Sequence, residues 1–189
     1  GAARFFVVAN SADELALDVS FLWSANTPFL VLGTGANLLI SDAGLDMVVV
    51  HNKAKAITID ATPSLFAESG AILATVARQA GLNGLTGLEW ASTIPGTLGG
   101  AIYGNAGAHG GDMSKSLVLA NILHRKKGHL SLTSEQMGYA YRSSALKRDP
   151  GNAVILSAQL AVQKGHVAAI KAQMEENAAR RKNTQPPGA

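Results

Sequence analysis

Residues 94–112, from Ile94 to Asp112, read IPGTLGGAIYGNAGAHGGD and contain seven glycines but only one formally charged residue, Asp112. Ordering a glycine costs backbone entropy, so this many in an apolar run indicates positions where a Cβ atom would collide with something. Pro95 and Gly96 indicate a turn, Thr97 is suited to cap a following helix, and exposed N–H groups at such a start can bind an anion. The stretch therefore predicts a ligand-binding loop and helix start, although close packing of a helix against a sheet would need similar glycines.

A second glycine-bearing turn lies in the other half of the chain, where residues 33–37 read GTGAN. It is not a dinucleotide fingerprint, because Leu38 stands where the third glycine should be, and neither turn contains the Gly-Lys-Ser/Thr of a Walker loop. One extended ligand could use both turns. The remaining interpretation is a pyrophosphate held by backbone amides of both, with Asn37 and Thr97 adding side-chain hydrogen bonds.

The composition is that of a globular protein, with 47% hydrophobic and 15% charged residues among 189. This length allows one large domain or two small ones. A net charge of +3 is too small to indicate nucleic acid, and the absence of cysteine excludes disulfides and thiolate metal sites. The chain has no apolar run of membrane-spanning length and no signal-peptide pattern, so we expect a soluble, cytoplasmic protein without a membrane partner.

Helical and strand patterns are mixed along the chain, which predicts an α+β fold rather than a purely parallel doubly wound sheet. A capping box at Ser11 and Glu14 begins a helix that should run to about Asn26. We expect further helices over 71–80 and 166–182, and strands over 5–9, 29–32, 38–40, 47–50, 56–59, 65–68, 117–124, 129–132 and 154–162. The turn signals at 60–63 predict two subdomains, a small one over 1–60 and a larger one over 61–189.

Five motifs, in their order and spacing, resemble those of the UDP-N-acetylenolpyruvoylglucosamine reductase (MurB) family: VLGTGANLL at 31–39, GLEW at 87–90, IPGTLGGA at 94–101, NAGAHG at 105–110 and YAYRSS at 139–144. The resemblance implies an FAD-binding fold of the vanillyl-alcohol-oxidase (PCMH-type) class, in which two α+β subdomains clasp FAD. It also implies that NADPH reduces the flavin, which then reduces UDP-N-acetylglucosamine enolpyruvate to UDP-N-acetylmuramate for peptidoglycan synthesis.

The same resemblance implies the site residues. FAD would be bound by Gly33, Thr34, Gly35, Ala36, Asn37 and Leu38, by Pro95, Gly96, Thr97, Gly99, Gly100, Asn105, Gly107 and Ala108, and by Ile155. The family usually has serine where Ala36 stands, so one hydrogen bond to phosphate is lost, worth about 1 kcal/mol. Arg142 matches the catalytic arginine that holds the substrate carboxylate as enolate charge develops, and Tyr141 would border the substrate.

Other interpretations of these residues remain open. Without the motif, Tyr141 and Arg142 would be ordinary surface packing and a solvated charge. The five histidines have no metal-ligand spacing, so we expect no metal site. Trp23 and Trp90 are expected in the core.

The resemblance does not extend to the whole family pattern. The family continues past a Thr-Gln-Pro segment into a proton-donating serine and a C-terminal substrate-binding domain, for which this chain has no matching positions. We therefore expect a monomeric FAD-binding part of a reductase that acts on a nucleotide-sugar, with activity only in the longer chain. The alternative is a non-catalytic flavin- or nucleotide-binding module, which Ala36 and the missing domain favour.

Overall fold

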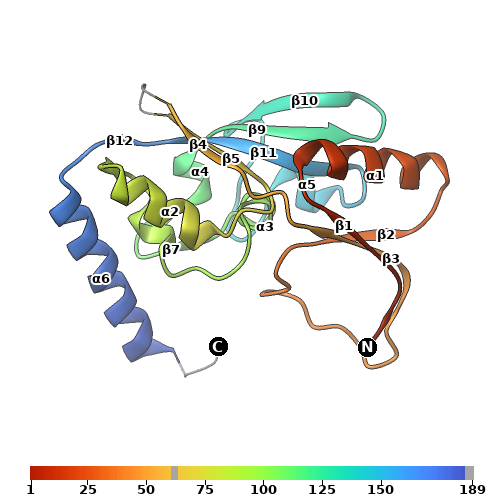
Figure 1. The fold of residues 1–189 in the computed structure, drawn as a ribbon, viewed down its shortest axis with the longest axis horizontal. Helices are drawn as coiled ribbons and strands as arrows, with labels where there is room; N and C mark the ends of the chain where they lie inside the picture. Colours follow the sequence, from red (N-terminus) through yellow and green to blue (C-terminus); the bar gives the residue numbers. More distant parts are fainter. Residues whose placement is uncertain (61–63, 186–189) are drawn as a thin grey trace.

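The computed structural model describes residues 1–60 and 64–185, which form two main sheets with helices packed against them (Figure 1). The smaller sheet has three strands and the larger has five. The mixture of helices, parallel pairs and antiparallel pairs confirms the predicted α+β class.

The smaller sheet is built from β1 (Ala3–Ala9), β2 (Phe29–Leu32) and β3 (Leu45–Asn52), in the order β1-β3-β2 with both pairs parallel. The helix α1 (Ala12–Ser24) connects β1 to β2 and buries Leu15, Val19 and Leu22 against the sheet, as the spacing of these residues predicts. The predicted cap is present, because the Ser11 hydroxyl accepts the Glu14 N–H at 3.1 Å. Trp23 is half-buried at the edge of this core.

The larger sheet is antiparallel, in the order β10-β9-β11-β5-β4. Its strands are β4 (Ile57–Ile59), β5 (Ser64–Glu68), β9 (Leu117–His124), β10 (Gly128–Thr133) and β11 (Ala153–Ala161). The predicted hairpin between β9 and β10 is confirmed, with Gly128 opposite His124.

One face of the larger sheet carries the main core. This core joins the sheet to α2 (Leu73–Leu82), the 3-10 helix η1 (Glu89–Ala91), α3 (Leu98–Gly104), α4 (Met113–Ser116) and α5 (Ala145–Arg148). Trp90 of η1 is buried, as predicted, and its Nε1–H donates to the Ser116 hydroxyl at 3.0 Å. Two short pairs complete this unit: β6 (Leu85–Thr86) with β12 (Gln163–Lys164), and β7 (Gly107–Ala108) with β8 (Gly111–Asp112).

The helix α6 (Val167–Thr184) lies at the periphery, next to α2 in Figure 1. Only Ile170 and Asn177 are buried on it, so polar contacts supplement a narrow apolar seam. The Asn177 amide donates to the Glu89 carbonyl at 3.0 Å, and Arg181 Nη1 donates to the Thr93 carbonyl at 2.8 Å. The helix is thereby tied to the chain that leads into residues 94–112. No helix in the described ranges is long and apolar enough to cross a membrane.

A carboxylate joins the two sheets. Glu68, at the end of β5, accepts the Ala12 N–H at 2.7 Å and the Ala56 N–H at 2.8 Å. Beside it, the buried Asn52 amide donates to the Ser69 hydroxyl at 2.8 Å. Because these bonds link the start of α1 and the end of β3 to the larger sheet, the two sheets have a defined relative position.

One predicted strand is absent from the structure, and the predicted subdomain boundary is not tested by it. The predicted strand at 38–40 is wrong: Leu38 closes a turn on the Gly35 carbonyl at 3.2 Å, and the segment joins no sheet. The division at 60/61 stays a prediction, although β4 pairs with β5 and so belongs to the larger sheet. Residues 61–63 of the predicted boundary, and those from 186 onward, lie outside the described residues.

Candidate functional site: two adjoining glycine turns

The two glycine-bearing turns lie against each other, although about sixty residues separate them along the chain. A Cβ atom on Gly33 would lie 2.6 Å from Thr97 Oγ1 and 2.7 Å from Thr97 Cγ2. A Cβ atom on Gly96 would lie 3.8 Å from Ala36 Cβ. The first turn follows β2 of the smaller sheet, and the second precedes α3, which packs against β5 and β11 of the larger sheet.

The first turn presents main-chain donors. Gly35 has a φ of 73°, a left-handed conformation that a glycine adopts without strain. Thr34, Ala36 and Asn37 are exposed. Within residues 1–60 and 64–185, the N–H groups of residues 34–37 donate to no other protein group. An unpaired run of N–H groups in a turn is typical of an anion-binding concavity.

The second turn contributes fewer free donors than its sequence predicts. The Leu98 and Gly99 N–H groups donate to the Ala71 and Ser69 carbonyls, both at 2.8 Å. The Gly100 N–H donates to the Thr97 hydroxyl at 3.4 Å, the cap expected of this threonine. Among the described residues, the Gly96 and Thr97 N–H groups donate to no protein acceptor. The available donors therefore lie before α3 rather than in its first turn.

Several glycines of residues 94–112 are explained by packing within the protein. A Cβ atom on Gly99 would lie 2.9 Å from Ser69 Cβ, and one on Gly111 would lie 2.5 Å from Cγ of the buried Trp90. A Cβ atom on Gly107 would lie 2.9 Å from Asp112 Cβ. The close-packing interpretation that the sequence left open therefore applies at these three positions.

Gly100 is different, because the protein itself does not require a glycine there. It is exposed, its φ is not left-handed, and an added Cβ atom would meet only Thr97 Oγ1, at 3.6 Å. Gly104, at the other end of the same helix, has nothing within 4 Å of an added Cβ atom. Open space beside unpaired N–H groups is the property expected of a surface that a ligand covers.

Arg142 lies at the border of this region. It shares a reverse turn with Tyr141, and its Nη2 is 3.4 Å from the Gly107 carbonyl, to which it donates. Both side chains are exposed, and the guanidinium carbon lies 5.8 Å from the centre of the Tyr141 ring. The structure therefore brings the predicted substrate residues next to the second glycine segment.

The remaining predicted residues lie in different surroundings. Pro95 and Leu38 are exposed, whereas Ala108 is half-buried in β7. Asn105 ends α3, and its side chain is engaged by two segments of the protein. Ile155 is 7% exposed in β11, opposite Ile122 in the main core. Of the predicted set, Ile155 is thus the residue held most firmly by core packing.

Two tyrosines near the segment are kept in their neutral form. Burial raises the pKa of Tyr139, and the Asp112 carboxylate raises it further. The Tyr139 hydroxyl has no hydrogen-bond partner among the described residues. Burial also raises the pKa of Tyr103. Neither phenol is a base at neutral pH.

Sequence reasoning missed two residues that support the site. The Ser69 carbonyl takes up the Gly99 N–H, and Lys147 Nζ donates to the Arg142 carbonyl at 2.8 Å. Ser69 lies at the end of a strand and Lys147 in a four-residue helix, and neither belongs to a recognisable motif. Only the tertiary structure shows these contacts.

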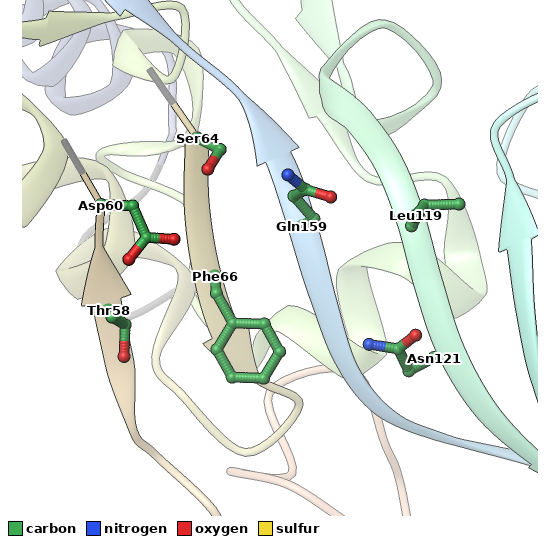
Figure 2. A pocket seen from close by; sticks show the side chains of 7 residues that line it. All are labelled: Thr58, Asp60, Ser64, Phe66, Leu119, Asn121 and Gln159. Carbon is green, nitrogen blue, oxygen red and sulfur yellow. The ribbon is translucent and has the colours of Figure 1, made fainter. Parts of the chain in front are cut away.

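A separate hollow lies on the outer face of the larger sheet, as Figure 2 shows. Its volume is about 300 Å³, and it is lined by Thr58, Asp60, Ser64, Phe66, Leu119, Asn121 and Gln159. The Asn121 side chain is already bonded to Ser157 and Ser131. The hollow contains none of the predicted site residues, so it is distinct from the glycine turns.

Comparisons with a family model and with curated proteins agree on one family. A family model described as an FAD binding domain matches residues 3–130. The UDP-N-acetylenolpyruvoylglucosamine reductase of Caldanaerobacter subterraneus subsp. tengcongensis is 38% identical over 98% of this chain and 61% of the relative. The same enzyme of Bacillus subtilis is also 38% identical, with the same two coverages. The chain thus spans about three fifths of the length of these relatives.

Solved structures agree with this result. The crystal structure of UDP-N-acetylenolpyruvylglucosamine reductase from Thermus caldophilus superposes with a TM-score of 0.79 at 28% identity, covering 96% of this chain and 63% of that one. Alkyldihydroxyacetonephosphate synthase, with a TM-score of 0.60 at 17% identity over 84% of this chain and 31% of that one, shares the fold alone. The predicted FAD-binding fold of the PCMH-type class is thereby confirmed. The chain belongs to the FAD-binding domain family, and nearly its whole length is similar to UDP-N-acetylenolpyruvoylglucosamine reductases.

Proposed function

We propose that the chain is the FAD-binding part of a UDP-N-acetylenolpyruvoylglucosamine reductase. In this proposal NADPH is the reductant, and UDP-N-acetylglucosamine enolpyruvate is converted to UDP-N-acetylmuramate for peptidoglycan synthesis in the cytoplasm. The observation that carries the proposal is the contact between Gly33 and Thr97, which joins two turns with unpaired N–H groups. The similarity to reductases over 98% of the chain supports the substrate class.

The residues present fit the diphosphate of FAD. The N–H groups of residues 34–37 and of Gly96 and Thr97 are suited to an anion with several oxygens, and no carboxylate belongs to either turn. Gly100 leaves open space beside them, where the cofactor would approach the backbone. When bound, the flavin supplies hydride transfer, while the protein supplies binding, orientation and charge.

Arg142 has the chemistry required for the substrate carboxylate. Its guanidinium is exposed, and among the described residues its one hydrogen bond is a long one, of 3.4 Å, to the Gly107 carbonyl. A fixed guanidinium binds a carboxylate with two parallel hydrogen bonds and stabilises negative charge that develops next to it. In the proposal Arg142 holds the substrate and offsets enolate charge, while Tyr141 borders the bound sugar nucleotide.

The cofactor test compares Gly100→Val with Gly104→Val. Both substitutions place the same side chain in α3, where an added Cβ atom meets nothing within 4 Å at Gly104 and only Thr97 Oγ1, at 3.6 Å, at Gly100. We expect wild type and Gly104→Val to take up FAD, seen as flavin absorbance that stays with the purified protein. Gly100→Val should lose this absorbance. Its midpoint of urea unfolding should nevertheless be nearly the same as that of Gly104→Val. Equal FAD uptake by both variants would contradict the proposed cofactor surface.

The reaction test is an anaerobic titration of the flavin-loaded protein, in monomeric form, with NADPH and then with the enolpyruvyl nucleotide-sugar. Loss and recovery of the flavin absorbance show reduction and reoxidation. Arg142→Ala should keep its FAD and its reduction by NADPH but reoxidise more slowly. Reoxidation of the flavin by the sugar would exclude the alternative, a non-catalytic flavin-binding module.

A further inference from the structure

The turn that carries Tyr141 and Arg142 has a conformation that its own residues do not favour. The Ala140 N–H donates to the Ser143 carbonyl and the Ser143 N–H donates to the Ala140 carbonyl, both at 3.1 Å. Arg142 occupies the left-handed region with a φ of 54°. Because residues with a Cβ atom avoid this region, the surroundings must impose it.

Burial of the turn does not explain how it is held. Tyr141 is 91% exposed, and Arg142 is exposed as well. Polar contacts remain. Lys147 Nζ donates to the Arg142 carbonyl at 2.8 Å, but the lysine side chain is itself exposed and belongs to the same local segment. Just after the turn, the buried Ser144 hydroxyl donates to the Tyr103 carbonyl of α3 at 2.7 Å, which holds the end of the segment but not the turn itself.

Asn105, at the end of α3, makes a hydrogen bond to the turn itself. Its Nδ2 donates to the Ala140 carbonyl at 3.0 Å, and its Oδ1 accepts the Ser114 N–H at 3.0 Å. The residue ends α3 with a φ of 48°, which asparagine tolerates better than most residues. Both ends of the side-chain amide therefore bridge segments that lie 35 and 9 residues away in the sequence.

We propose that Asn105 is a positioning residue for Arg142. Its amide fixes the Ala140 carbonyl to the end of α3 and so holds the left-handed turn that presents the guanidinium beside Gly107. The inference rests on the proposed function for the role of Arg142, and it replaces the sequence-based assignment of the Asn105 side chain to FAD. The bond to the Ala140 carbonyl is the link that matters here, because it reaches the turn itself, whereas the Ser144–Tyr103 bond lies beyond the turn and the Arg142–Gly107 bond is long, at 3.4 Å.

The test uses Asn105→Asp, which keeps the shape of the side chain and an oxygen to accept the Ser114 N–H. It replaces the donor facing the Ala140 carbonyl with a second acceptor, so that one link breaks and becomes repulsive. Asn83→Asp is the matched control, because Asn83 also ends a helix and its Nδ2 donates to a backbone carbonyl, that of Gln79, at 2.9 Å. Both variants add the same charge.

The first readout is the rate of trypsin cleavage after Arg142, relative to cleavage after Lys127 in the β9–β10 hairpin. Cleavage requires local opening, so loss of the anchor should raise the relative rate about tenfold in Asn105→Asp. Asn83→Asp should cleave like wild type. An unchanged ratio in Asn105→Asp, or equal acceleration at both sites, would overturn the proposal.

The second readout separates positioning from cofactor binding. We expect Asn105→Asp to bind FAD as wild type does and to be reduced normally by NADPH, while the KM for the enolpyruvyl sugar rises about tenfold. Weaker FAD binding with a normal tryptic pattern would instead make Asn105 a cofactor ligand. If wild type takes up no FAD, the proposed function fails, whereas the cleavage ratio still decides whether Asn105 anchors the turn.

Discussion

The two glycine turns are equally rich in glycine but use it in different ways. In the first turn, Gly33 allows contact with Thr97, Gly35 supplies a left-handed bend, and the residues around them are exposed. In residues 94–112, Gly99 and Gly111 instead make room for other parts of the protein itself. The number of glycines in a segment therefore does not measure how much of it touches a ligand.

The difference follows from where each segment lies. The first turn leaves the edge strand β2 of the smaller sheet, and three of its five residues are exposed. Residues 94–112 run between the larger sheet and η1, where α3 touches β5 and β8 touches η1. A segment enclosed on several sides needs small residues for packing before it can offer any surface to a ligand.

The largest expected effect is on folding, at a glycine of the enclosed segment. In Gly111→Ala the new methyl group would lie 2.5 Å from Cγ of the Trp90 ring, which is buried and cannot move freely. We expect the free energy of unfolding to fall by about 2 kcal/mol, measured by urea denaturation. Gly104→Ala, with open space around it, should be neutral or slightly stabilising. Equal stability of the two variants would show that packing does not require a glycine at position 111.

The next effect concerns the contact between the turns. Gly33→Ala would push against the Thr97 side chain and separate the two rows of N–H groups. We expect FAD to bind about tenfold more weakly, as measured by flavin fluorescence titration, with the fold retained. Adding Thr97→Ala removes the two closest atoms and should restore part of the affinity. No rescue in the double variant would show that Gly33 acts through something other than this contact.

The smallest effect tests the exposed turn. Ala36→Ser adds the hydroxyl that the resembling family usually has, at an exposed position next to unpaired N–H groups. One further hydrogen bond to phosphate is worth about 1 kcal/mol, so FAD should bind roughly fivefold more tightly. Ala43→Ser, on the same connection between β2 and β3, is the control and should leave FAD affinity unchanged. Unaltered affinity in Ala36→Ser would place residue 36 away from the phosphates.

Much of the fold could be predicted because its elements have local causes. The capping box at Ser11 begins α1, and the Lys126-Lys127-Gly128 turn joins β9 to β10. The strand predicted at 38–40 is wrong because the Gly35 turn leads Leu38 and Leu39 to the surface, where an apolar triplet has no strand to pair with.

The sequence predicted which residues form the candidate site, but not which of their hydrogen-bonding groups are already paired within the protein. The sequence indicated that both turns carry main-chain donors, but it could not show that Ser69 and Ala71 already accept the Gly99 and Leu98 N–H groups. Nor could spacing reveal that the Asn105 side chain bridges to Ala140 rather than lying free. Such contacts depend on residues brought together only by the sheets.

The carboxylate of Glu68 has a consequence for how FAD would enter. Because this carboxylate accepts the Ala12 N–H at the start of α1, the relative position of the two sheets is set by a contact within the protein and not by contacts to FAD. An incoming diphosphate would meet prearranged donors, and uptake would require no slow closing movement of one half onto the other. Loading should then follow a single exponential whose rate grows linearly with the amount of FAD supplied.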